Sequence, residues 1–281
     1  MLCLQETKLQ ESHLDDPKLE LRGNLLEEEG YDAYYSCSTG KKGYSGTAVF
    51  VKCHGKKTKQ MGIDSFFRKK ENDFMAVVPD TPVPVEMLTP LKVSYETGKQ
   101  IDDEGRTIIV DFPFATITNV YVPNSGQTLQ RLKYRTEEWD KDFLQVMQKK
   151  QSDRGLPVIW LGDLNVAHTA LDVWNDGAKH LAKQAGVTPE ERASFQAQLD
   201  AGFVDAFRKL HGSETAGHYS YWSQRAGNRS ENKGLRLDYF ICPPELFDES
   251  AKVVVRDSYM LFDEDGSDHC PVVLELEIKS N

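Results

Sequence analysis

The sequence predicts a layered α/β fold built as a single domain, 1–281. Short apolar runs of strand length recur along the chain and are separated by turn residues such as glycine, proline and asparagine. A few longer segments instead carry apolar residues at the spacing of a helix face. Strands interleaved with a few helices predict sheets that are covered by helices. With 281 residues, of which 39% are hydrophobic, the chain can bury a sizeable core.

The expected elements can be placed along the chain in order. Strands are expected at 1–4, 34–37, 47–51, 91–94, 107–110, 115–122, 158–161, 236–241, 252–255 and 271–278. One helix is expected over 14–26, before Gly30, and a second over 127–150, where apolar residues form a helical stripe. A third helix is expected after Thr188, because a capping residue, Pro189 and a reciprocal Glu191 form a typical helix start.

Composition narrows the class of protein. The formal net charge of −10 at pH 7 argues against a surface that is basic throughout, but it leaves room for a local basic groove around an acidic centre. The five cysteines are odd in number and lack CxxC spacing, so reduced thiols in an intracellular compartment are expected. No apolar run reaches the length of a membrane span, and no signal peptide opens the chain.

The first four residues resemble the end of a strand whose beginning would precede residue 1. Met1 to Leu4 resemble the end of a buried strand, yet chain termini usually lie at the surface. We therefore expect that a first strand is missing, either through truncation or because the protein lacks it.

One stretch, 158–168, organises the search for chemistry. An apolar run stops at Gly162, and an acid, an amide and an imidazole follow within six residues. In an extended chain Asp163 and Asn165 face the same way, so their carboxylate and carboxamide can hold and deprotonate one water. Glycine followed by aspartate is also ordinary turn chemistry, and this stretch alone favours neither interpretation.

Acidic residues stand at the ends of several expected strands. Each one alone is more often a solvated turn residue, but carboxylates gathered at one sheet edge repel one another unless a divalent cation neutralises them. An all-oxygen set suits Mg²⁺ or Mn²⁺, and the sequence has no Cys/His spacing for zinc. These acids are Glu6, Asp163, Asp238, and Asp268 followed by His269.

Six ordered motifs give the chain a recognisable family likeness. They are Leu4-Gln5-Glu6-Thr7-Lys8, Gly43-Tyr44-Ser45-Gly46, Tyr121-Val122-Pro123-Asn124, Gly162 to His168, Arg236-Leu237-Asp238-Tyr239 and Gly266 to Pro271. In this respect the chain resembles the exonuclease III-type apurinic/apyrimidinic endonucleases, within the wider endonuclease/exonuclease/phosphatase superfamily. The resemblance implies a four-layered α/β sandwich, in which two packed mixed β-sheets are flanked by helices and the N-terminal strand is missing here.

The resemblance also implies roles for the motif residues. Glu6 and Asp268 would hold Mg²⁺ (or Mn²⁺) with help from Asp163 and Asn165. Asp163 would activate water that Asn165 positions, and His269, oriented by Asp238, would donate to a phosphate oxygen.

Further residues would bind DNA. Tyr121 and Asn124 would bind the scissile phosphate, although a half-buried strand tyrosine and a turn asparagine are the plainer interpretations. Tyr221 and Trp222 would wall the pocket for the flipped abasic sugar, or form an ordinary core pair. Phosphate or DNA contacts are expected from Arg225, Tyr44 and Lys8.

Residues 52–88 read as an inserted flexible loop that carries a signal of its own. The loop is rich in lysine, proline and glycine. Within it Gln60, Ile63, Phe66 and Phe67 resemble the peptide that docks on the proliferating cell nuclear antigen sliding clamp. The alternative is that these apolar side chains fold back onto the protein's own surface.

The predicted function is a divalent-metal-dependent DNA repair endonuclease. It would cleave the phosphodiester 5′ to abasic sites in double-stranded DNA, as in base excision repair, with 3′-phosphodiesterase or 3′–5′ exonuclease activity in addition. The alternatives are a related phosphodiesterase acting on RNA, lipid or inositol phosphate, and a catalytically weak clamp-binding repair adaptor. A monomer in the nucleus with no membrane partner is expected, and an organellar form stays open.

Overall fold

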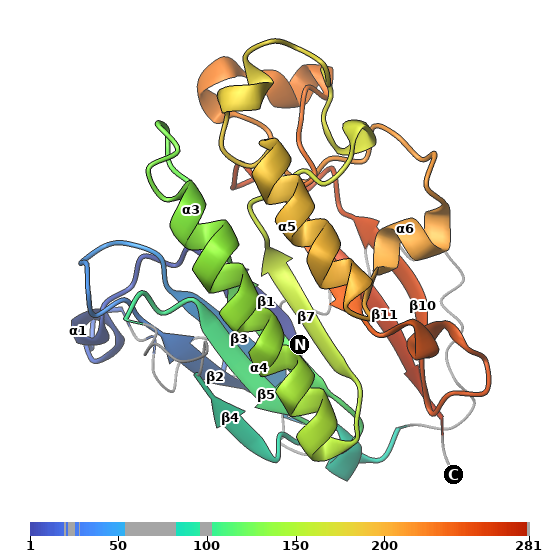
Figure 1. The fold of residues 1–281 in the computed structure, drawn as a ribbon. Coiled ribbons are helices and arrows are strands. Elements are labelled where there is room, and N and C mark those ends of the chain that lie inside the picture. Colours follow the sequence, from blue (N-terminus) through green and yellow to red (C-terminus); the bar gives the residue numbers. More distant parts are fainter. Residues whose placement is uncertain (20, 22–25, 28, 54–82, 96–102, 280–281) are drawn as a thin grey trace.

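The computed structural model describes residues 1–19, 21, 26–27, 29–53, 83–95 and 103–279. These residues form two layers of β-structure, with the long helices packed on one side (Figure 1). The predicted α/β class with two packed layers of strands is therefore confirmed.

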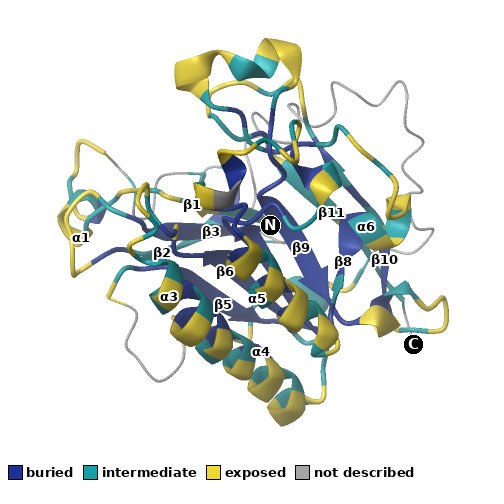
Figure 2. Ribbon diagram, turned by 45° about the horizontal axis from the view of Figure 1, so that its top comes forward, coloured by how far each residue is buried: buried dark blue, intermediate teal, exposed yellow. Residues whose placement is uncertain are grey.

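A mixed sheet of six strands forms the centre of the described fold. Its strand order is β4-β5-β6-β7-β9-β8, and among these pairs only β6 and β7 run parallel. The middle strands are buried on both faces, which accounts for their nearly continuous apolar sequences (Figure 2). The strands are β4 Lys92–Ser94, β5 Thr107–Asp111, β6 Thr116–Tyr121, β7 Val158–Asp163, β8 Val204–Asp205 and β9 Asp238–Cys242.

The second layer consists of two smaller antiparallel sheets. One has the order β1-β3-β2, with β1 Leu2–Gln5, β2 Tyr31–Ser36 and β3 Thr47–Lys52. The other pairs β10 Val253–Met260 with β11 Val272–Ile278. Apolar side chains from both layers form one core cluster, which includes Val49, Ile159, Phe240 and Val255.

A buried amide fastens the second layer to the first. Asn119 lies in β6 and is fully buried, and its Nδ2 donates to the carbonyls of Leu4 and Ala48 at 3.0 Å each. Its Oδ1 accepts from Gln5 Nε2 at 2.6 Å. Because both β1 and β3 are tied to one side chain of the central sheet, the position of the residue after β1, Glu6, is fixed relative to β6.

Helices cover the opposite face of the six-stranded sheet. α3 Leu132–Tyr134 continues through a π-helical turn, Arg135–Trp139, into α4 Asp140–Arg154, and α5 Pro189–Asp200 lies beside α4 (Figure 1). Trp139, Phe143 and Phe195 pack there on Trp160 of β7. α1 Glu11–Leu14 and α6 Ala206–His211 are short and lie at the margins. No helix in the described part of the chain is long and apolar enough to cross a membrane.

Short 3-10 helices complete the described secondary structure. They are Val85–Leu88, Ala170–Asp172, Leu181–Lys183, Gln224–Ala226, Asn228–Glu231 and Pro244–Phe247.

Several expected element boundaries were wrong. The helix expected over 14–26 is limited, among the described residues, to Glu11–Leu14. Pro17 explains this, because it lacks an N–H and disfavours the helical conformation of Asp16 before it. The helix expected from residue 127 begins at Leu132, after Leu129 with a positive φ of 59°. The expected start of α5 is confirmed: the Thr188 hydroxyl accepts from Glu191 N at 3.2 Å.

The sequence analysis missed β8 and α6, and the insert is only partly described. Asp205 caps α6 through its carboxylate, which is a signal that the sequence contains. At the edges of the expected insert, β3 includes Lys52, and Met87 and Leu88 pack against the core. The predicted clamp-binding residues 60–67 lie outside the described residues.

We expect Gly162→Ala to destabilise the protein by about 2–4 kcal/mol, because both strain and overpacking arise. Gly162 in β7 has a φ of 134°, and a Cβ atom there would lie 2.0 Å from the carbonyl oxygen of Val120. Chemical denaturation followed by tryptophan fluorescence measures the loss. The matched control is Gly155→Ala, with a φ of 59° and open space around the added Cβ. That change should cost only about 1 kcal/mol, and equal losses in the two variants would contradict the steric argument.

Candidate active site

Three polar side chains lie in one row across the central sheet. Tyr121 is the register partner of Asp163 in the parallel pair β6–β7, and Asp238 is its partner in the antiparallel pair β7–β9. Neighbouring strands lie about 4.8 Å apart, so both partners are adjacent to Asp163. All three residues are buried, with exposed fractions of 9%, 7% and 7%. Strand pairing therefore brings together three of the predicted site residues.

The loops after β7 and β6 add one side-chain amide each to this row, Asn165 and Asn124. Asn165 has a left-handed backbone, with a φ of 49°, and its N–H donates to Asp163 Oδ1 at 2.8 Å. Its Nδ2 donates to the carbonyl of Val122 at 2.9 Å, and its Oδ1 accepts from Asn124 Nδ2 at 2.8 Å. The predicted pairing of Asp163 with Asn165 is thus present, and Asn124 extends it to the exposed surface.

Arg135 holds this loop from behind. Its guanidinium is buried and donates to the carbonyls of Leu164 and Asn165 at 2.6 Å each. Glu191, also buried, forms an ion pair with Arg135 at 3.3 Å. The sequence analysis did not find Arg135, whose contacts cross from the helical layer to the sheet. Its position in a π-helical turn became visible only in the structure, and such turns are frequent at functional sites.

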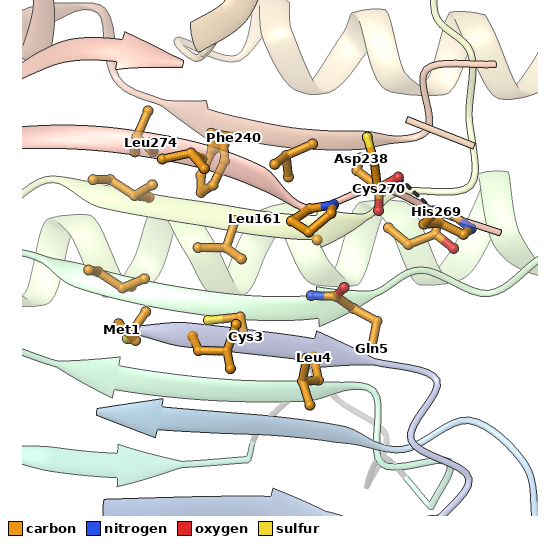
Figure 3. Close-up of a pocket in the computed structure, with 18 of the residues that line it drawn as sticks. Met1, Cys3, Leu4, Gln5, Leu161, Asp238, Phe240, His269, Cys270 and Leu274 are labelled. Carbon is orange, nitrogen blue, oxygen red and sulfur yellow. Dashed lines mark hydrogen bonds and ion pairs between the residues drawn. The ribbon is translucent and has the colours of Figure 1, made fainter. Parts of the chain in front are cut away.

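His269 completes the row on the β9 side. Its Nδ1 lies 2.7 Å from Asp238 Oδ2, as predicted, and the dashed line in Figure 3 marks this contact. The ring of Tyr221 lies 5.0 Å from the His269 ring, and the two residues also form a β-bridge. Tyr221 is half-buried, so it can both support His269 and face a ligand.

The surroundings set the protonation of these groups. Burial raises the pKa of Asp163 to about 7, a rise that the charge of His269 opposes and that of Asp238 reinforces. Burial alone would lower the pKa of His269, but the charge and hydrogen bond of Asp238 raise it to about 10. Burial also raises the pKa of Tyr121 above its usual range. Near neutral pH, His269 and Tyr121 are therefore proton donors and Asp163 can accept a proton.

A second group that the sequence analysis missed lies behind Tyr121. The guanidinium of Arg106 is 4.9 Å from the centre of the Tyr121 ring and donates to the carbonyl of Tyr121 at 2.8 Å. The Tyr44 hydroxyl accepts from Arg106 at 3.0 Å and from Arg131 at 2.6 Å. Tyr44 therefore supports Tyr121 through Arg106, which contacts both tyrosines.

A cavity of about 780 Å³ runs from this row into the space between the layers. Its polar end is lined by site residues from four separate parts of the chain: Glu6, Lys8, Asp163, Asp238, Asp268 and His269. Its apolar end lies between β1 and β11 (Figure 3). Each of these two is an edge strand of its small sheet among the described strands. Two unpaired strand edges therefore face the cavity.

Trp222 and Arg225, both expected to bind DNA, have very different environments. Trp222 is only 3% exposed and belongs to a core cluster with Phe207 and Tyr219, which agrees with the alternative interpretation of an ordinary core residue. Its indole N–H donates to Asn232 Oδ1 at 3.1 Å. Arg225 lies exposed on the 3-10 turn Gln224–Ala226, where it is accessible as predicted.

The fold and this site identify the class of protein to which the chain belongs. Residues 1–269 match the Endonuclease/Exonuclease/phosphatase family, and the chain is a member of it. Enzymes of this superfamily are divalent-metal-dependent nucleases and phosphatases.

Particular relatives narrow the comparison. The chain is 36% identical to an exodeoxyribonuclease of Bacillus subtilis, over 99% of this chain and 88% of the relative. It is 35% identical to a DNA-(apurinic or apyrimidinic site) endonuclease of Dictyostelium discoideum, over 99% of this chain and 63% of that protein. Among solved structures, an AP endonuclease of Leishmania major superposes with a TM-score of 0.74 at 28% identity, over 99% of this chain and 78% of the other.

The oxygen donors that line the cavity are of the chemical type that a hard divalent cation prefers. Glu6 and Asp268 line it together, and Glu6 Oε1 forms an ion pair with Lys8 Nζ at 3.2 Å. However, no three His, Cys, Asp or Glu residues of the described chain lie close enough together to hold a metal ion. The predicted set of Glu6, Asp163, Asn165 and Asp268 is therefore not gathered as one shell. Mg²⁺ tolerates such a site, because it keeps several waters and commonly uses only one or two carboxylates.

We expect the Asp238–His269 pair to make stability depend on pH. Because the pKa of His269 is raised from 6.5 to about 10 on folding, the pair stabilises the fold fully below pH 6.5. That contribution is lost as the pH rises towards 10. Melting temperatures measured between pH 6 and pH 10 should therefore fall by several degrees more in the wild type than in Asp238→Asn. Parallel curves for the two proteins would show that the pair does not stabilise the fold.

Proposed function

We propose that the chain is a divalent-metal-dependent endonuclease that cleaves the phosphodiester 5′ to abasic sites in DNA, with 3′-phosphodiesterase or 3′–5′ exonuclease activity in addition. The observation that carries the proposal is the row of Tyr121, Asp163 and Asp238, extended by His269 on one side and by Asn165 with Asn124 on the other. The names of the Bacillus and Dictyostelium relatives support DNA as the substrate.

The attacking water would be handled by Asp163 and Asn165. With a pKa of about 7, the Asp163 carboxylate accepts a proton from water near neutral pH without becoming too weak a base. The N–H of Asn165 holds one carboxylate oxygen at 2.8 Å, which leaves the other oxygen for the water. Arg135 fixes the carbonyls of the same loop, so the base does not need to reorganise during the reaction.

The phosphate would be held by proton donors on either side of this base. His269 carries a positive charge near neutral pH and donates through Nε2 while Asp238 holds Nδ1. Tyr121 is a neutral phenol whose hydroxyl can donate to a second phosphate oxygen. Both donors stabilise negative charge that grows on the phosphate in the transition state.

Mg²⁺ is the metal that the donors favour, with Mn²⁺ as a substitute. Glu6 and Asp268 would hold it, because they supply carboxylate oxygens at the same end of the cavity. When bound, the ion supplies positive charge that stabilises the developing charge on the phosphate and the leaving oxygen.

The decisive test is incision of a duplex that contains one abasic-site analogue, in the presence of Mg²⁺. Asp163→Asn should lower kcat by about 10²–10⁴-fold, since it removes the general base while keeping its shape. Asp153→Asn is the matched control: Asp153 is an exposed acid on α4, paired with Lys149, and the variant should keep wild-type activity.

Competing substrates separate this proposal from a related phosphodiesterase. Intact duplex, single-stranded RNA and an inositol polyphosphate are offered in excess over the abasic duplex. Failure of the wild type to incise abasic DNA, or preference for RNA or inositol phosphate, would refute the proposed activity.

We further propose that Gln60, Ile63, Phe66 and Phe67 bind a sliding clamp and that the enzyme works in the nucleus. Two aromatic residues in a polar, lysine-rich segment support this, together with the eukaryotic relatives. Binding of the full chain to the purified clamp should be lost in the double variant Phe66→Ala, Phe67→Ala. Unchanged binding of the double variant would refute the proposal that these residues bind the clamp. A fluorescent fusion of the protein that is found in the cytoplasm would refute the proposed nuclear location.

A further inference from the structure

One tryptophan stands apart from the other three. Trp139, Trp160 and Trp222 are buried, with exposed fractions of 7%, 1% and 3%, whereas Trp174 is 44% exposed. Tryptophan offers a large flat ring, and an exposed one is typical of a surface that binds a partner. The roles proposed above for the active site do not use Trp174.

Strand-like pairing links Trp174 to the active site. Val173 forms a bridge with Leu235, Leu235 with Tyr221, and Tyr221 with His269. Three such steps of about 4.8 Å place the Trp174 segment about 14 Å from His269. The loops that carry Trp174 and Leu235 gather at the end of the molecule to which the β7 arrow points (Figure 1). DNA bound at the site would pass close by, since 14 Å corresponds to about four base steps of 3.4 Å.

The backbone of Trp174 is tied to a neighbouring loop, and a cation lies beside its ring. The Trp174 N–H donates to the carbonyl of Gly234 at 3.1 Å, and the Lys233 ammonium lies 5.4 Å from the ring centre. Gly234 is closely packed, because a Cβ there would lie 2.6 Å from the Tyr219 Cβ. Lys233 also forms an ion pair with Glu231, and a bound phosphate could compete with Glu231 for the Lys233 ammonium.

An exposed aromatic face with an adjacent cation matches the chemistry of an unstacked nucleotide. The indole provides a stacking surface for any base, and the ammonium can contact its phosphate. Bases inside an intact duplex have both faces covered by their neighbours and cannot use such a surface. A base without a partner, such as the one opposite an abasic site or one in a single strand, can.

We infer that Trp174 and Lys233 form a stacking subsite for an unpaired base of the bound DNA. The inference rests on the proposed function for the choice of DNA as ligand. It adds a residue that would favour substrates with an unpaired base over intact duplex.

Intrinsic fluorescence provides a direct test, because only one of the four tryptophans is exposed. The full chain is titrated in EDTA, so that the DNA stays intact, with an abasic-analogue duplex, a single strand and a fully paired duplex. The first two DNAs should quench the fluorescence more strongly than the paired duplex. Trp174→Phe should abolish this quenching while it keeps affinity within about twofold, because a ring remains.

Binding constants supply the second readout. Trp174→Ala should raise Kd for the abasic duplex and the single strand by at least about fivefold, and should change Kd for the paired duplex much less. Tyr95→Ala is the matched control, because Tyr95 is a similarly exposed aromatic residue, at 45%, beside β4. It should leave all three constants unchanged.

Two results would overturn the inference. One is quenching that persists in Trp174→Phe, and the other is a Kd for Trp174→Ala within twofold of the wild type on every DNA. Both are measured without incision, so they are independent of the proposed activity. A protein that incises abasic DNA normally but shows either result lacks the subsite, whereas quenching without incision would refute the activity alone.

Discussion

The register of β7 between β6 and β9 is the constraint on which the site depends. It places Asp163 opposite Tyr121 on one side and Asp238 on the other, three residues that are far apart in the chain. A slip of one residue in either pair would turn the side chains of the strand to the other face. The register is secured because β7 is buried on both faces, with Ile159 and Leu161 in one core cluster and Val158 and Trp160 in another.

Electrostatic repulsion is the cost of this arrangement. Asp163 and Asp238 are buried neighbours, so the charge of Asp238 helps to raise the pKa of Asp163 and a positive partner is needed nearby. His269 supplies that charge beside Asp238, and Arg135 approaches the Asp163 loop from the helical side. Positive charge therefore approaches the candidate site from both faces of the sheet, from His269 on one face and from Arg135 on the other.

The sequence predicted the residues that end strands and missed those that join layers. Asp163, Asp238 and His269 are recognisable because each follows or begins an apolar run of strand length, and strand ends meet at sheet edges. Arg135 and Arg106 have no local signal, because their contacts with the Asn165 and Tyr121 segments are set by tertiary packing. For Trp222 the sequence left two interpretations open, because two adjacent aromatic residues carry no signal of which ring lies in the core.

Secondary structure followed the same division. The start of α5 was predictable because a cap is a local interaction between Thr188 and Glu191. The prediction of a helix over 14–26 was wrong because it relied on the spacing of leucines and neglected Pro17. The effect of proline on a helix is also local, so this error was avoidable from the sequence.

The two strand edges that face the cavity have a consequence for how the protein must fold. Unpaired edges are templates for aggregation, and those of β1 and β11 border the cavity between the layers. The two edges come to lie on one cavity only after the chain ends have come together, and contacts between distant segments form slowly. Both edges are therefore most open to neighbouring chains in the interval before assembly.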